Sequence, residues 1–211
     1  MDTSSIEKII ADCQADPGSD EELHELLAAI AERHGTQASG EALARGADFV
    51  KSYVEQVPYM MKVAHTAAGN VGLAPQMDRI LQSVVSYWEQ DDDIIPDHLG
   101  IIGLLDDAYC SLTSLQTVSD HFQLQTGKYL FPDNLTGANR VMRRIIGEPY
   151  VTDLDRVVIR TMRDARVVES MIELASEEKR LNVANESTIW SHGSAGRMKT
   201  DGLEALGLTG D

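Results

Sequence analysis

Apolar side chains recur at helical intervals along most of the chain, and this spacing limits the possible folds more than any other feature. In the clearest case, after Pro75, apolar residues return every three or four positions. These residues are Met77, Ile80, Leu81, Val84, Val85 and Trp88. No segment stands out with the strict alternation of apolar and polar residues that is typical of a half-buried strand. The sequence therefore predicts an all-α protein.

End signals divide this pattern into about seven helices. Two short helices open the chain, and residues 4–7 and 19–22 each have the Ser-x-x-Glu spacing of a capping box. A longer helix follows Ser39 and is expected to kink or restart at Pro58, because proline has no amide hydrogen to donate. Thr152 is expected to cap the last long helix.

We expect these helices to form a multi-helix bundle around a central helical hairpin, with its arms at about 75–90 and 104–125. The second arm is apolar over a wide face, which predicts a central position for it. The expected organisation is short N-terminal helices (1–37), a helical core (38–147), a long C-terminal helix (148–182) and a loosely ordered tail (183–211).

The charge of the chain restricts its partners. Its 211 residues include 34 acidic and 18 basic side chains, for a formal net charge of −16. Such a surface repels phosphate backbones, so general nucleic-acid binding is disfavoured. Two distant cysteines, no signal-peptide pattern and no apolar run of membrane-spanning length predict a cytoplasmic protein, with membrane association disfavoured.

Four carboxylates surround the short apolar turn of the expected hairpin, and they form the candidate metal site: Asp93, Asp97, Asp106 and Asp107. Mg²⁺, Mn²⁺ and Ca²⁺ prefer oxygen ligands, and a turn can bring two acidic pieces together. His98 adjoins this cluster and is a further candidate ligand. The sequence therefore allows a divalent-cation site at the turn.

The same carboxylates also have a local explanation. Asp93 and Asp97 would cap the turn, while Asp106 and Asp107 would lie in the first turn of a helix, at the positive end of its dipole. Adjacent helical residues point about 100° apart, so Asp106 and Asp107 reach one ion only if that turn is irregular. If an ion does bind, His65 could approach the four carboxylates from another helix. The sequence leaves both interpretations open.

The turn also carries a family resemblance. Its pieces are Tyr87-Trp88, Asp93-Ile94-Ile95-Pro96-Asp97, Gly103 and Leu105-Asp106-Asp107-Ala108. The combination resembles the signature of the YkvA-like family of uncharacterised domains, commonest in bacteria, over roughly residues 59–122. The resemblance implies no established activity. It implies membrane association for many members through two apolar segments, but polar residues interrupt both segments here, which indicates a soluble branch.

The third quarter of the chain differs from the rest in charge, since residues 135–181 carry 9 basic and 8 acidic side chains. Its candidate partner-binding residues are Arg140, Arg143, Arg144, Arg156, Arg160 and Arg163. Arginine clusters can bind a phosphate-bearing ligand or an acidic partner. The alternative is that they balance the acidic N-terminal part within the fold.

The sequence contains no HExxH, paired CxxC, GxSxG or P-loop spacing. We therefore expect a non-enzymatic protein that acts through protein–protein contact in a regulatory or scaffold role, with self-association through the C-terminal helix as a further expectation. The alternative is a divalent-cation-dependent enzyme, such as a phosphoester hydrolase, that uses the acidic turn. Peripheral membrane association is the third and weakest expectation.

Overall fold

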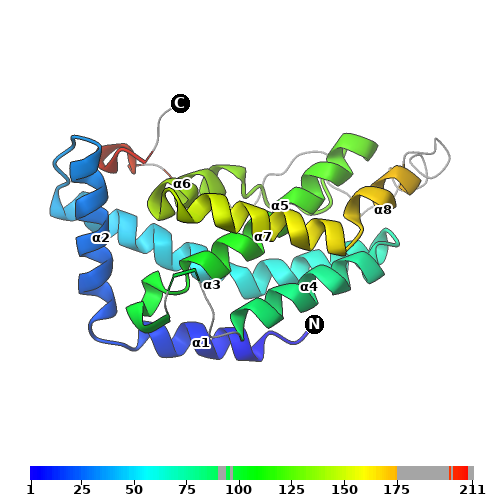
Figure 1. The fold of residues 1–211 in the computed structure, drawn as a ribbon, viewed down its shortest axis with the longest axis horizontal. Coiled ribbons are helices and arrows are strands. Elements are labelled where there is room, and N and C mark those ends of the chain that lie inside the picture. The colour runs from blue at the N-terminus through cyan, green and yellow to red at the C-terminus, as the bar shows by residue number, and fades with distance from the viewer. Residues whose placement is uncertain (90–93, 96, 175–199, 201, 209–211) are drawn as a thin grey trace.

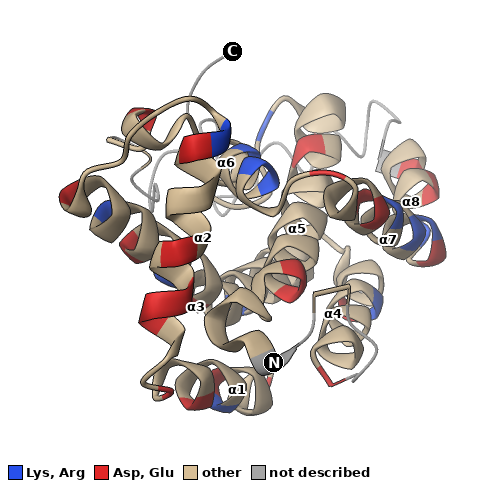
Figure 2. Ribbon diagram, turned by 60° about the vertical axis from the view of Figure 1, so that its left-hand side comes forward, with Lys and Arg blue, Asp and Glu red and all other residues tan. Residues whose placement is uncertain are grey.

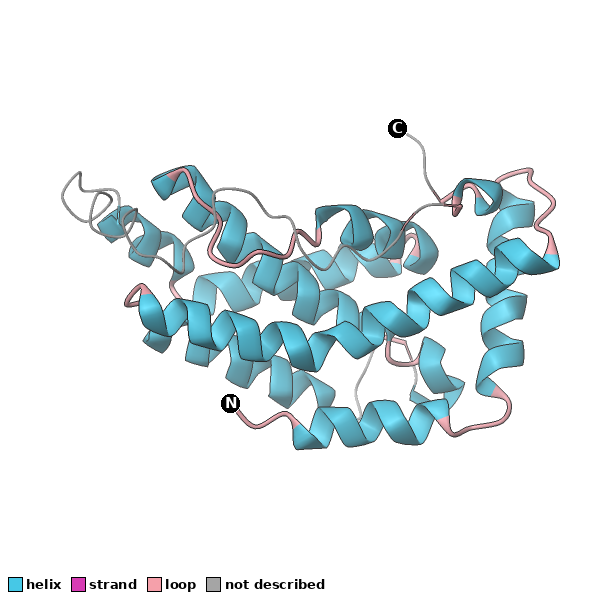
Figure 3. Ribbon diagram, turned by 180° about the vertical axis from the view of Figure 1, so that it is seen from behind, coloured by secondary structure: helices cyan, strands magenta, loops and turns pink. Residues whose placement is uncertain are grey.

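The described part of the chain folds into eight α-helices and two short 3₁₀ helices, with no strand among them (Figures 1 and 3). This computed structural model describes residues 1–89, 94–95, 97–174, 200 and 202–208. The α-helices are α1 (Ser4–Gln14), α2 (Ser19–Arg33), α3 (Gly40–Asn70), α4 (Ala74–Trp88), α5 (Leu105–Thr126), α6 (Thr136–Ile146), α7 (Tyr150–Asp164) and α8 (Val167–Leu174). The 3₁₀ helices are η1 (Asp97–Ile102) and η2 (Glu204–Leu206). The predicted all-α multi-helix bundle is confirmed.

Helix α5 lies at the centre of the bundle, where it packs against α3, α4, α6, α7 and α8 (Figure 1). It buries apolar residues such as Leu112, Leu115 and Phe122, together with small polar residues such as Ser114 and Ser119. Small side chains on several faces let neighbouring helices approach from different directions. Gly127, in a left-handed conformation, ends the helix.

The N-terminal capping boxes are wrong in detail. Helix α1 begins at Ser4, so Thr3 is the N-cap residue, and its hydroxyl donates to Glu7 Oε1 over 2.8 Å. Helix α2 begins at Ser19 itself, and the Ser19 hydroxyl oxygen accepts a hydrogen bond of 3.1 Å from the amide of Ile101 in η1. A serine that resembled a local cap therefore makes a tertiary contact.

Helix α3 begins and continues for local reasons. Ser39 caps it, because its hydroxyl oxygen accepts a hydrogen bond of 3.2 Å from the amide of Ala42. The helix then runs through Pro58 to Asn70 without restarting. Burial of residues on both sides of Pro58, including Val57 and Met61, compensates for the lost backbone hydrogen bond.

The single C-terminal helix over 148–182 is wrong within the described residues. Helix α7 begins at Tyr150, so Thr152 lies inside its first turn and donates to Glu148 Oε2 over 2.6 Å. The chain then breaks at Arg166, whose φ of +56° ends one helix before α8 begins. Residues 175–182 lie outside the described part, and self-association through this region stays a prediction.

The tail also differs from expectation where the structure describes it. Leu203, Leu206 and Leu208 are at most 1% exposed, although loose order was predicted for 183–211. Leu206 contacts α3 at Gly46, where an added Cβ would lie 2.7 Å from a leucine methyl carbon. Figure 1 shows η2 in red beside α2. Three leucines spaced along a short segment therefore attach it to the bundle.

None of the helices in the described ranges combines the length and the apolar composition that crossing a membrane requires.

Candidate anion-binding site

The acidic turn folds back on itself, and Asp106 bonds its two ends together. Asp106 is fully buried in the first turn of α5, as is nearly all of Asp107. Asp106 Oδ2 accepts hydrogen bonds of 3.1 Å from the amides of both Ile94 and Ile95, and one of 3.3 Å from the Tyr87 hydroxyl. The predicted first-turn position of both carboxylates is confirmed. Asp106 also caps the turn itself, a role that we assigned to other residues.

Burial raises the pKa of Asp106 above its ordinary value of 3.8, while the hydrogen bonds from backbone amides oppose that rise. A carboxylate removed from water loses hydration, and three donors on one oxygen return only part of that loss. The donors to Oδ2 explain how Asp106 holds the turn in place.

The metal-site prediction stays a prediction. Asp93 lies outside the described residues, and Asp97 and His98 are described only in their backbone. His65 Nδ1 lies 3.5 Å from Asp78 Oδ1 on α4. Among the side chains that the structure describes, no three of His, Cys, Asp and Glu gather closely enough to hold a metal ion.

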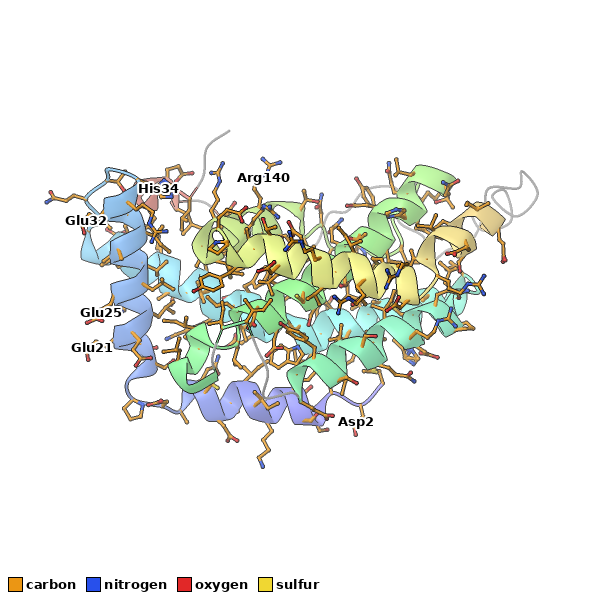
Figure 4. The ribbon with its side chains drawn as sticks, viewed as in Figure 1. Asp2, Glu21, Glu25, Glu32, His34 and Arg140 are labelled. Carbon is orange, nitrogen blue, oxygen red and sulfur yellow. The ribbon has the colours of Figure 1, made fainter. Side chains whose placement is uncertain are left out.

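Three of the six candidate arginines do come together, at a pocket of about 580 Å³ between the end of α2, helix α6 and η2. Its lining residues are Arg33, His34, Arg140, Arg143, Arg144, Gly147, Glu148, Val151 and Gly207. Figure 4 shows His34 at the end of α2 beside η2, and Arg140 projecting outward from α6. Four guanidinium groups thus surround one cavity in a strongly acidic chain.

Arg143 forms the rigid wall of this pocket. It pairs with Asp155 of α7, lies 3.8 Å from Glu148 and donates to the Tyr109 hydroxyl over 3.3 Å. The Tyr109 hydroxyl in turn donates to Asp155 over 2.8 Å. Burial, followed by that bond to Asp155, raises the pKa of Tyr109 to about 12, and the Asp155 carboxylate raises the pKa of Arg143. These bonds tie α5, α6 and α7 together and engage the Arg143 charge within the fold.

Arg144 forms a second fixed wall, because its guanidinium donates to the Leu208 carbonyl over 3.0 Å. Arg33, His34 and Arg140 differ from both. Their side chains are exposed and make no hydrogen bond or ion pair with any residue of the described ranges. Arg33 also approaches α6 closely, since its Nη1 would lie 3.9 Å from a Cβ added at Gly147. The pocket therefore has two guanidinium groups, those of Arg33 and Arg140, that are uncommitted, meaning that they have no hydrogen-bond or ion-pair partner among the described residues. They lie beside the Arg143 and Arg144 groups, which do have such partners.

The other three candidate arginines lie on α7 and do not line the pocket. Arg156 pairs with Asp153 on the same helix, and Arg163 lies 3.0 Å from its neighbour Asp164. Arg160 is exposed. The ion pairs described for this segment are local, so they do not provide the expected balance of the acidic N-terminal part.

Arg33 and His34 are two basic pocket residues that sequence reasoning missed. Both end α2, where a basic residue has an ordinary explanation in the negative end of the helix dipole. Nothing in the spacing of the sequence relates them to α6. The packing of η2 on α2, and the approach of Arg33 to Gly147 at the end of α6, bring them together.

No protein-family model, no curated protein and no solved structure matches this chain. The resemblance of residues 87–108 to the YkvA-like family therefore rests on the motif alone.

Proposed function

We propose that this chain is a non-enzymatic interaction protein that binds an acidic group of a partner protein in the pocket between α2, α6 and η2. The observation that carries the proposal is the pair of uncommitted guanidinium groups of Arg33 and Arg140 at one cavity. Arginine presents five donors in a planar fork that matches carboxylate and phosphate oxygens. We further propose that the contact takes place in the cytoplasm.

The surroundings of these two residues support binding rather than internal stabilisation. In the described part of the chain, the nearby acidic groups Asp155 and Glu148 are already engaged with Arg143. The charges of Arg33 and Arg140 therefore face solvent, where an incoming anion can reach them. A charge-assisted hydrogen bond contributes about 1.5–3 kcal/mol, so each arginine can change affinity by about tenfold or more.

The test uses a labelled peptide with two central glutamates, compared with the same peptide carrying two glutamines. We expect fluorescence polarisation to detect binding of the glutamate peptide only. The double substitution Arg33→Gln with Arg140→Gln is expected to weaken that binding by about tenfold or more. Because neither side chain bonds to a described residue, this double variant is expected to stay folded.

The matched control is Arg156→Gln with Arg160→Gln, which removes the same charge from an exposed face of α7. We expect this control to bind the peptide as the wild type does. Equal losses in the two double variants would show a general charge effect and would overturn the proposal. Equal binding of the glutamate and glutamine peptides would overturn it as well.

A further inference from the structure

The charges around the pocket limit the shape of the anion that can enter it. Glu32 directly precedes Arg33, and Glu148 lines the pocket itself. Figure 4 shows Glu21, Glu25 and Glu32 projecting from α2 on the side away from the bundle, and Figure 2 shows acidic positions along α2 beside basic positions on α6. An extended acidic segment that reaches past the pocket would approach Glu32 and Glu148, whose repulsion opposes its binding. The surroundings therefore favour negative charge concentrated in one small group.

The free donors in the pocket exceed what one carboxylate can use. A carboxylate has two oxygens, and a single guanidinium satisfies both in a bidentate contact. Arg33 and Arg140 project from two different helices, and the exposed His34 ring lies beside Arg33 in the chain. A phosphate monoester carries about 1.5 to 2 negative charges on three terminal oxygens. Two guanidinium groups balance that charge, and their N–H groups can donate to all three oxygens.

We propose that the acidic group bound in this pocket is the phosphate monoester of a phosphorylated serine or threonine on the partner protein. This inference rests on the proposed function and specifies its ligand. Arg33 and Arg140 donate to the terminal phosphate oxygens, while the Arg143 and Arg144 side chains form walls fixed by Asp155 and the Leu208 carbonyl. Val151 supplies apolar lining for the aliphatic carbon that bears the phosphate.

The experiment compares three labelled peptides of one frame, with a central phosphoserine, a central pair of glutamates or a central serine. The first two carry nearly the same total charge, so their difference reports whether the charge must be on one group. We expect the phosphoserine peptide to bind about tenfold or more tightly than the glutamate peptide, and the serine peptide not to bind. Competition by inorganic phosphate, with sodium chloride at matched ionic strength as control, is expected for the wild type.

Substitution separates the pocket from the remaining surface. Arg33→Gln with Arg140→Gln is expected to abolish the preference for phosphoserine, whereas Arg156→Gln with Arg160→Gln keeps it. Equal affinity for the phosphoserine and glutamate peptides, lost in the pocket variant, overturns this inference and leaves the proposed function standing. If neither peptide binds, both proposals fail. Preference for phosphoserine that survives in the pocket variant also overturns the inference, because the phosphate then binds elsewhere.

Discussion

At the scale of single residues, one carboxylate oxygen holds the turn before α5 in place. Asp106 Oδ2 accepts from two consecutive backbone amides and from the Tyr87 hydroxyl, and all of these groups lie close to the buried start of α5. Ser19 holds the other side of the turn, because its hydroxyl oxygen accepts a hydrogen bond from the Ile101 amide. The acidity of this segment is therefore used in part to satisfy backbone donors that would otherwise be buried without acceptors.

Asp106→Asn tests the buried environment of this carboxylate through the pH dependence of stability. The raised pKa of Asp106 means that the folded state holds its proton to a higher pH than the unfolded state does. The contribution of Asp106 to wild-type stability is therefore expected to fall as pH rises from 3.8, the ordinary pKa, through the folded-state pKa. Asparagine keeps a carbonyl acceptor but cannot ionise. We expect the stability of the variant relative to the wild type to increase across that window and then level off.

Urea unfolding at a series of pH values from about 4 to about 8 gives this difference directly. Asp48→Asn, which removes a carboxylate from an exposed position on α3, is the matched control. A relative stability of Asp106→Asn that decreases as pH rises would mean that the folded state lowers this pKa, contrary to the buried environment described above.

At the scale of elements, the segment 202–208 completes the pocket from a distant part of the chain. Its three leucines are buried, the Leu208 carbonyl accepts from Arg144, and Gly207 lines the cavity. Gly207 has a φ of +70°, and an added Cβ would lie 2.7 Å from the His34 Cβ, so glycine is required at this close approach. The position of His34 thus depends on the segment 202–208, which contributes no charged side chain to the pocket lining.

Leu206→Ala is expected to release this segment while the bundle stays folded. Truncating a fully buried leucine costs about 2–5 kcal/mol, and here the loss falls on a short peripheral element. We expect limited proteolysis to cut within 202–208 about tenfold faster or more, and the affinity for the acidic peptide to decrease. Leu124→Ala, at a leucine of α5 that is 75% exposed, provides the control. Cleavage of Leu206→Ala at the wild-type rate would show that this leucine does not hold the segment.

At the scale of the whole molecule, the chain combines a strongly acidic composition with a basic pocket between α2, α6 and η2. The helical bundle could be predicted because apolar periodicity acts locally, as in the stripe from Met77 to Trp88, which is buried at five of its six positions. The break at Arg166 could not, since no proline or glycine marks it. The pocket could be predicted only in part, because Arg140, Arg143 and Arg144 share α6 whereas Arg33 joins them through tertiary packing.

The most direct test of the pocket as the binding site is to observe its arginine side chains during binding. In two-dimensional NMR spectra, we expect the Nε–Hε signals of Arg33 and Arg140 to shift as the phosphoserine peptide is added, while those of Arg156 and Arg160 on α7 stay in place. Assignments would come from the corresponding glutamine variants. Shifts confined to Arg156 and Arg160, with Arg33 and Arg140 unchanged, would contradict the claim that this pocket binds the partner.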